Sequence, residues 1–194
     1  QEKRKVVLAK KLVSGDEKEA EKFYKEAVDS GNEGLMIKNL HSPYKPGARV
    51  NHMVKLKPTM ENLDLVIVGA EWGTGKRATW LSSFVLACVD DDGNFLEIGK
   101  VGTGIKEKEE EGVSFKQLTE ELKPLIISQK GREVTVKPKI VVEVTYGEIQ
   151  NSPTYSSGYA LRFPRVVKLR LDRDASECSG LDMVEDFYYA QKKK

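Results

Sequence analysis

Several features are scarce in this chain, and each absence removes a class of protein. The two cysteines, Cys88 and Cys178, have no histidine or further cysteine at metal-ligand spacing. They therefore provide neither a disulfide framework nor a zinc site. No apolar run approaches the roughly 20 residues that cross a bilayer, and the first residues lack the apolar core of a secretion signal. We therefore expect a cytoplasmic protein with no membrane partner.

The overall composition is that of an ordinary globular protein. The 194 residues are 39% hydrophobic, and 32 lysines and arginines stand against 30 acidic residues, for a net charge of +2. This balance argues against intrinsic disorder and allows one domain or two small ones. Because the chain starts with Gln1 rather than methionine, we expect a processed product or part of a longer protein.

Acidic residues are almost missing from two stretches of this balanced chain. None occurs from Gly34 to Met60, and Asp172 is the single acid between Tyr159 and Arg173. The cations are Lys38, Lys45, Arg49, Lys55 and Lys57 in the first stretch and Arg162, Arg165, Lys168, Arg170 and Arg173 in the second. Such clusters create a positive field that binds polyphosphate or a nucleic-acid backbone. The alternative is a pair of solvated strand faces that are basic without a ligand.

The first 57 residues predict one helix and two short strands. Apolar residues recur at helical spacing over 16–30, with Asp16 or Ser14 as the N-cap and Gly31 after the end. The apolar run 34–38 is typical of a buried strand. Residues 54–57 alternate apolar and basic side chains, which predicts a strand with Lys55 and Lys57 facing one side.

After Pro58 the pattern changes to short β-runs separated by turn signals. The runs are 63–69, 82–89, 95–101, 133–136 and 140–145, with an amphipathic helix near 114–122. A helix between the third and fourth strands is the order of an oligonucleotide-binding (OB) barrel. We expect a final basic strand over 160–171, a helix over 181–190 and a basic tail.

Four segments in fixed order carry a family resemblance. They are Glu33–Lys38 (EGLMIK), Tyr44–Arg49 (YKPGAR), Lys55–Lys57 (KLK) and Ala160–Arg165 (ALRFPR). Together they resemble the ATP-dependent DNA ligases, closest to the archaeal type, over essentially the whole chain. The resemblance implies an α+β, mainly β architecture. Residues 1–58 would be the C-terminal part of the adenylation (nucleotidyltransferase) domain, and 59–194 an OB-fold domain with a C-terminal helix and basic tail.

The resemblance also implies a reaction. Ligases of this family form a lysine–AMP adduct, pass AMP to the 5′ phosphate of a nick in double-stranded DNA, and seal it with the 3′ hydroxyl. They serve in DNA replication, repair and recombination, and the resemblance implies association with the nucleoid. Glu33 would bind a catalytic Mg²⁺, which suits a carboxylate. Arg49, Lys55 and Lys57 would contact ATP, with the two lysines nearest the α-phosphate.

The basic strand resembles the last ligase motif, which closes over the triphosphate. Arg162 and Arg165 would orient the pyrophosphate leaving group, and Arg170 and Arg173 would add contacts to the nucleotide. This role implies closure of a hinged domain. Lys38, next to the proposed metal ligand, is either structural or a weaker phosphate contact.

Two departures from the family pattern affect the expected activity. Met53 stands where an aromatic residue commonly precedes the paired lysines. The sequence also contains no Lys-x-Asp-Gly, the motif with the lysine nucleophile. We therefore expect this chain to be inactive alone and to need the missing N-terminal part of the ligase as a partner, with a sliding clamp as a further candidate partner.

Two other functions remain open. A stand-alone DNA-binding OB module would use the basic strands without chemistry, and an RNA-capping guanylyltransferase shares the two-domain plan. Glu33 and the paired lysines before the barrel favour a ligase over a binding module. The Arg162–Arg165 run favours a ligase over a capping enzyme.

Overall fold

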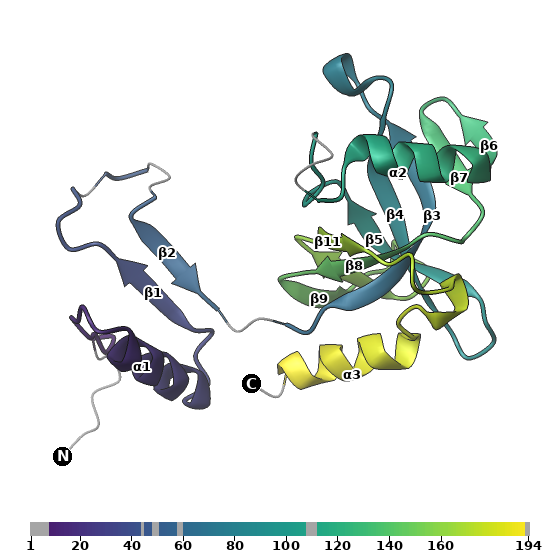
Figure 1. Cartoon of the computed structure of the whole chain (residues 1–194). Coiled ribbons are helices and arrows are strands. Elements are labelled where there is room, and N and C mark those ends of the chain that lie inside the picture. The colour runs from purple at the N-terminus through teal and green to yellow at the C-terminus, as the bar shows by residue number, and fades with distance from the viewer. Residues whose placement is uncertain (1–7, 44, 48–50, 58–59, 108–111, 193–194) are drawn as a thin grey trace. The chain divides into compact units, whose positions relative to one another are not determined.

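The computed structural model describes residues 8–43, 45–47, 51–57, 60–107 and 112–192. The chain divides into two compact units, a smaller one within residues 1–59 and a larger one within 60–193 (Figure 1). Among the described residues, no helix is long and apolar enough to cross a membrane.

The smaller unit consists of a helix and a two-stranded hairpin. Its elements are α1 (Glu17–Asp29), β1 (Leu35–Lys38) and β2 (Met53–Leu56). The helix begins after Asp16, whose side chain accepts a hydrogen bond from the Lys18 amide at 2.8 Å. β1 and β2 are antiparallel, with Leu35 opposite Leu56. The predicted helix and both strands are therefore present.

The burial predicted for the first strand is wrong. None of the described residues of the smaller unit is buried. Ile37 on β1 is 48% exposed, and Val54 opposite it on β2 is 56% exposed. No further layer of described residues covers the apolar side chains of these two strands. The side chains therefore remain in contact with solvent.

The larger unit contains a seven-stranded antiparallel sheet, a separate two-stranded ribbon of β9 and β10, and flanking helices. Its strands are β3 (Leu63–Trp72), β4 (Leu81–Val89), β5 (Phe95–Val101), β6 (Ile126–Lys130), β7 (Glu133–Val136), β8 (Val141–Thr145), β9 (Glu148–Asn151), β10 (Tyr159–Arg162) and β11 (Arg165–Leu169). Its helices are α2 (Phe115–Leu122), α3 (Leu181–Lys192) and the short 3₁₀ turns η1 (Gly75–Arg77), η3 (Lys123–Leu125) and η4 (Ala175–Glu177). The fold is therefore α+β and mainly β, as predicted.

β3 organises the barrel because it pairs with three strands. It pairs with β4 along one edge, and on the other with β8 at its first half and β7 at its second half. α2 lies between β5 and β7 in the chain, which is the OB order. The Leu81 amide on β4 donates to the buried Thr119 hydroxyl of α2 at 2.9 Å, which ties this helix to the sheet.

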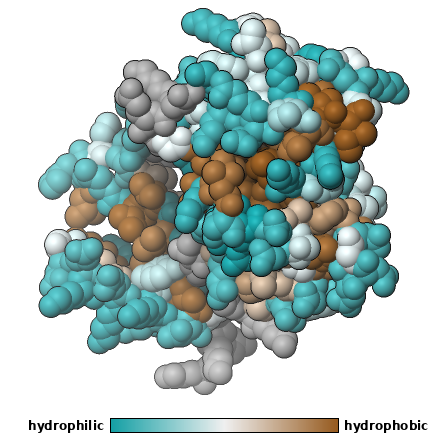
Figure 2. All heavy atoms as spheres, turned by 45° about the vertical axis from the view of Figure 1, so that its right-hand side comes forward, coloured by the Kyte–Doolittle hydropathy of each residue, from teal (hydrophilic) through white to brown (hydrophobic). Residues whose placement is uncertain are grey.

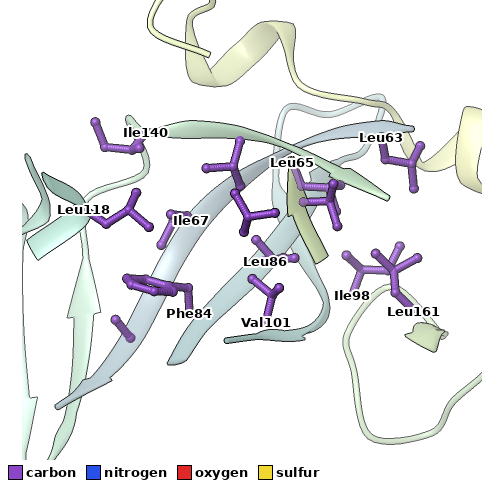
Figure 3. Packing of buried hydrophobic residues seen from close by; sticks show 14 of the residues in the cluster. Leu63, Leu65, Ile67, Phe84, Leu86, Ile98, Val101, Leu118, Ile140 and Leu161 are labelled. Carbon is purple, nitrogen blue, oxygen red and sulfur yellow. The ribbon is translucent and has the colours of Figure 1, made fainter. Parts of the chain in front are cut away.

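The core of the larger unit is continuous from sheet to helices. Phe84 and Leu86 on β4 are fully buried, as is Leu118 on α2. Leu161 on β10 belongs to the same cluster and lies at the opposite end of it from Leu118 (Figure 3). Burial of these side chains is the main source of stability for this unit.

The single basic strand predicted over 160–171 is wrong, because the chain bends within it. β10 ends at Arg162, β11 begins at Arg165, and the two strands belong to different sheets. Phe163 between them has a φ of 54°. Positive φ is unfavourable for a bulky side chain, so a regular strand cannot pass through this residue.

The C-terminal helix packs beside the β9–β10 ribbon. The Gln191 side chain of α3 accepts from the Ile149 amide at 3.0 Å and donates to the Ile149 carbonyl, so it pairs with β9 as a neighbouring strand would. The Tyr159 hydroxyl on β10 donates to Glu185 at 3.2 Å. Of the predicted basic tail, Lys192 ends the helix and its ammonium lies 4.2 Å from the Tyr188 ring centroid. Residues 193–194 lie outside the described residues.

Candidate functional site

In the smaller unit, an ion pair joins the two ends of the β1–β2 hairpin. Lys57 follows β2, and its Nζ lies 2.9 Å from Oε2 of Glu33, which precedes β1. The hydrogen bond and charge of Lys57, with the charge of Lys55, hold the pKa of Glu33 below its ordinary value. The structure therefore brings together the carboxylate and the lysine that the sequence singled out.

The ion pair depends on a close approach of the two strand ends. Gly34 has a φ of 135°, and a Cβ there would collide with the carbonyl oxygen of Leu56. Only glycine permits this backbone arrangement, which sets Glu33 beside Lys57. Lys55 lies on β2 opposite Met36, and it is exposed. Arg49, the third basic residue predicted here, lies outside the described residues.

The second group of candidate residues forms a corner, residues 162–165, between β10 and β11. Arg162 is opposite Glu148 on β9, and Arg165 is opposite Thr145 on β8. The same number of residues separates the two pairs on each strand, so both pairs share one register. The two ladders therefore form one hairpin that bends at the corner. The Gly147 amide donates to the Arg162 carbonyl at 2.8 Å and carries the pairing into the bend.

The two corner arginines differ in their surroundings. The Arg162 guanidinium lies 3.2 Å from the Glu148 carboxylate and 4.9 Å from the centroid of the Phe163 ring. Arg165 is exposed, and among the described residues its side chain makes no hydrogen bond or ion pair. A carboxylate therefore holds the first arginine, while the second presents a full positive charge to solvent.

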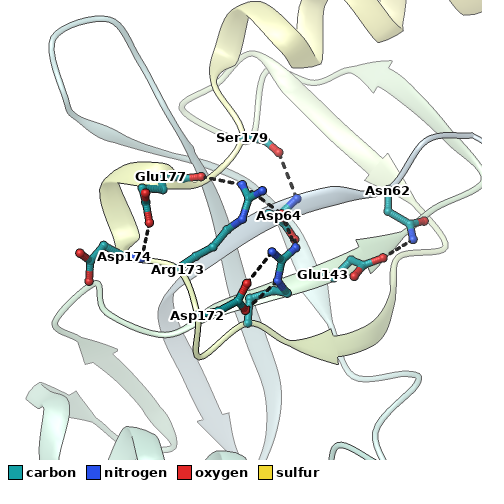
Figure 4. A network of polar contacts seen from close by, with 9 residues as sticks. Asn62, Asp64, Glu143, Asp172, Arg173, Asp174, Glu177 and Ser179 are labelled. Atoms are coloured by element: carbon teal, nitrogen blue, oxygen red, sulfur yellow. Dashed lines mark hydrogen bonds and ion pairs between the residues drawn. The ribbon is translucent and has the colours of Figure 1, made fainter.

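The other two predicted arginines belong to an ion-pair network centred on Asp64, near the start of β3. Arg170 donates to both carboxylate oxygens of Asp64, at 2.8 and 3.1 Å, and to both of Asp172 (Figure 4). Arg173 lies 3.3 Å from the same Asp64 carboxylate. The Arg170 and Asp64 side chains are only 17% and 12% exposed. This geometry favours a structural role for Arg170 over direct contact with a nucleotide.

The network also changes proton affinities. The hydrogen bonds from Arg170 hold the pKa of Asp172 well below its ordinary range. The same interactions, with Asp172 first, raise the pKa of Arg170. Both groups therefore stay charged throughout the physiological pH range, and the network persists there.

Sequence reasoning missed three residues that hold the candidate arginines. Asp64 is 106 positions from Arg170, and Thr103 is 61 positions from Pro164, whose carbonyl accepts its hydroxyl hydrogen bond. Such separations leave no periodic signal in a sequence. Glu148 had a usable signal, because it opposes Arg162 in a short hairpin and opposite charges commonly pair across strands.

One groove of the larger unit is separate from these candidates. It has a volume of about 940 Å³ and is lined mainly by β3, β5, β6 and β7. Its charged residues are mixed in sign, and the Glu71–Lys100 ion pair spans 2.6 Å within it. None of the predicted site residues lines it.

The metal prediction is compatible with the residues present. No group of three or more potential metal ligands occurs among the described residues. Mg²⁺, however, is commonly bound by one or two carboxylates together with water and substrate phosphates. Glu33 is 84% exposed at its side chain and could supply such a single ligand once its pair with Lys57 opens.

Apolar side chains accompany the basic ones at both places. In the smaller unit Met36 and Met53 are 46% and 40% exposed, and in the larger unit Phe163 is 76% exposed. Apolar patches reach the surface between polar side chains in the space-filling view (Figure 2). Both candidate regions therefore combine positive charge with exposed apolar side chains.

Comparison with known proteins identifies two matching family models. The model described as "ATP dependent DNA ligase C terminal region" matches residues 77–173. The model described as "ATP dependent DNA ligase domain" matches residues 1–57. The first match covers the corner, and the second covers Glu33, Lys55 and Lys57.

Individual relatives agree with the family models. The chain is 56% identical to a DNA ligase of Nanoarchaeum equitans over 93% of its length, and 51% identical to one of Archaeoglobus fulgidus over 98%. These alignments cover 32% and 34% of the relatives, so the chain spans about a third of their length. The crystal structure of the ligase domain of M. tuberculosis LigD matches with a TM-score of 0.50 and 28% identity, over 80% of this chain and 50% of that one.

Family models and relatives together account for nearly all of the chain. The matches leave out only residues 58–76 and 174–194 of the sequence, and the archaeal relatives extend across both. The chain therefore belongs to the ATP-dependent DNA ligase family, as the order of its basic motifs predicted.

Proposed function

We propose that this chain forms part of an ATP-dependent DNA ligase that seals 5′-phosphate/3′-hydroxyl nicks through enzyme–AMP and DNA–AMP intermediates. Residues 1–58 would complete the adenylation domain, and residues 59–194 would form the OB-fold domain. The observation that carries the proposal is the meeting of Glu33 with Lys57 beside Lys55, on a hairpin within the matched ligase domain. A module that only binds DNA has no use for a carboxylate among phosphate-binding lysines.

The residues of the hairpin have distinct roles in this proposal. Lys55 and Lys57 would donate hydrogen bonds to the α-phosphate of ATP and stabilise the negative charge that develops there. Glu33 would bind Mg²⁺, which neutralises phosphate charge when bound. Lys57 and Glu33 pair with each other in this structure. When ligands bind, the phosphate of ATP would replace Glu33 as the partner of Lys57, and Mg²⁺ would replace Lys57 as the partner of Glu33.

The corner would act on the other end of the nucleotide. Arg165 presents a guanidinium that no described residue pairs with, which suits a phosphate oxygen. Arg162 would exchange its half-exposed Glu148 partner for phosphate at small cost, because exposed ion pairs contribute little. Arg173 is 40% exposed and retains access to solvent, whereas Arg170 would chiefly hold the network together.

The proposal requires a nucleophile from elsewhere. The chain has no Lys-x-Asp-Gly sequence, so it should not acquire AMP by itself. The test is the intact mass of the chain after incubation with ATP and MgCl₂. A parallel reaction contains the part of the Nanoarchaeum equitans ligase that this chain does not match. We expect no change for this chain in either reaction, and one AMP on the added part only when the chain is present.

Variants connect the result to the hairpin. The double variant Lys55→Ala/Lys57→Ala should abolish AMP transfer to the added part, while Lys22→Ala on the exposed surface of α1 should leave it unchanged. Labelling of this chain alone would contradict the proposal and require a nucleophile within these residues. Nicked-DNA binding without AMP transfer in the combined reaction would favour a DNA-binding module.

A further inference from the structure

The turn after β5 lies directly against the corner. The Thr103 hydroxyl donates a hydrogen bond to the Pro164 carbonyl at 2.6 Å. The Thr103 carbonyl accepts a hydrogen bond from the Val166 amide at 2.9 Å. One residue thus fixes the backbone on both sides of Arg165, although 61 positions separate it from Pro164.

The next residue in the turn, Gly104, lies against the Arg165 side chain. Gly104 has a φ of 85°, and a Cβ there would collide with the Val166 carbonyl. The same Cβ would lie 2.7 Å from Cγ of Arg165. The aliphatic stem of the arginine therefore rests on bare backbone, and any side chain at Gly104 would displace it.

These contacts matter because no ion pair or side-chain hydrogen bond among the described residues directs the Arg165 guanidinium. Arg162 is aimed by its ion pair with Glu148, whereas the Arg165 guanidinium has no partner among the described residues. Its position depends on its backbone and stem alone. The neighbouring Phe163 has positive φ, and such a conformation persists only where the surroundings hold it in place.

We propose that Thr103 and Gly104 are positioning residues that hold Arg165 where it can meet the triphosphate of ATP. The inference rests on the proposed function, since it assigns a support to a residue that the function uses. Thr103 touches neither nucleotide nor DNA in this proposal. It acts by limiting the directions in which Arg165 can point before the nucleotide arrives, so that less order has to be created on binding.

The first test uses the 194-residue chain alone and needs no activity. Thr103→Val removes the hydroxyl donor and keeps the side-chain shape, and Thr103→Ser keeps the donor. Hydrogen–deuterium exchange of the peptide covering residues 162–166 should be about tenfold faster in Thr103→Val, and restored in Thr103→Ser. The matched control is Thr79→Val in the exposed loop before β4. Unchanged exchange in Thr103→Val would overturn the inference.

The second test separates positioning from general loss of structure. In the ligase assembled from this chain and the unmatched part of the Nanoarchaeum equitans relative, two rates are measured: formation of enzyme–AMP from ATP, and sealing of a nick that already carries 5′ AMP. Thr103→Val should slow the first about ten- to a hundredfold and raise its KM for ATP. The second should stay within about twofold, because no triphosphate takes part.

The outcomes distinguish failure of the positioning role from failure of the proposed function. If Arg165→Ala slows enzyme–AMP formation and Thr103→Val does not, the positioning role fails and the proposed function stands. If both rates fall together in Thr103→Val, the residue is merely structural and the inference also fails. If Arg165→Ala itself leaves enzyme–AMP formation unchanged, the proposed role of the corner fails and the inference fails with it.

Discussion

The β1–β2 hairpin and the Arg162–Arg165 corner present candidate phosphate-binding residues on opposite kinds of support. The hairpin belongs to a unit in which no described residue is buried, and its Lys57–Glu33 pair is mostly exposed. The corner belongs to the larger unit, which has a continuous core. Hydrogen bonds from Thr103 and Gly147 hold the backbone of the corner. The difference teaches that a buried core supports the cations of the corner, whereas the described residues provide no such core beneath those of the hairpin.

Substitution of one apolar residue in each unit should give the largest contrast. Leu86→Ala removes a fully buried side chain from the barrel and should lower the free energy of unfolding by about 2–5 kcal/mol. Ile37→Ala on the half-exposed hairpin should change it by less than about 0.5 kcal/mol. Urea denaturation followed by circular dichroism measures both. Equal losses would mean that the hairpin has a core of its own.

The Asp64 network should show how far the rigid support extends along the basic segment. Asp64→Asn removes the shared charge between Arg170 and Arg173 and should lower the melting temperature by roughly 5 °C. Asp172→Asn, at a side chain that is 61% exposed, should lower it by no more than about 2 °C. Differential scanning calorimetry would detect either change. A larger loss for Asp172→Asn would place the centre of the network elsewhere.

Alkaline titration should reveal the contact between α3 and β10. Burial first, and then the charge of Glu185, raises the pKa of Tyr159 from 10.0 to about 12. The folded state therefore favours the neutral phenol, and this contribution to stability is complete below pH 10 and is lost as the pH rises toward 12. Absorbance at 295 nm should show a tyrosine titrating near pH 12 that Tyr159→Phe removes. Glu185→Gln should lower that pKa.

The smallest effect is expected at the hairpin ion pair. Glu33→Gln should leave the melting temperature unchanged within error, because both partners are largely solvated. The pair should still be visible in proton affinity, since Lys57 lowers the pKa of Glu33. In a ¹³C carboxyl NMR titration, Lys57→Met should raise that pKa toward its ordinary value. The contribution of the pair is complete above the ordinary pKa and is lost as the pH falls through the lowered pKa of the folded state.

Local signals in the sequence predicted much of the fold. Asp16 and the apolar spacing after it located α1, and short β-runs between turn signals located β3, β4, β5, β7 and β8. The same reasoning failed at Phe163, because a β-propensity pattern carries no information about a single residue with positive φ. It also failed for the burial of β1, since apolar residues indicate what a strand can bury and not what covers it.

The candidate site was predictable in its residue types and less so in its geometry. Glu33 and Lys57 were both singled out, but their mutual ion pair depends on Gly34, which allows the start of β1 to approach the end of β2. Asp64 gave no signal because its partners are more than a hundred positions away. Glu148, by contrast, is 14 positions from Arg162 and lies opposite it in a hairpin, so this pair was within reach of the sequence.

The continuous register through the corner limits how the length of this protein can vary. Two residues on each strand span the bend, between the pairs Arg162 with Glu148 and Arg165 with Thr145. One extra residue in either strand would exchange the exposed position of Arg165 with the buried position of Val166. Insertions should therefore be tolerated at the exposed residues Pro153 and Thr154 of the turn after β9 and excluded from the corner. Sequence comparisons that open a gap inside residues 162–165 can be rejected on physical grounds.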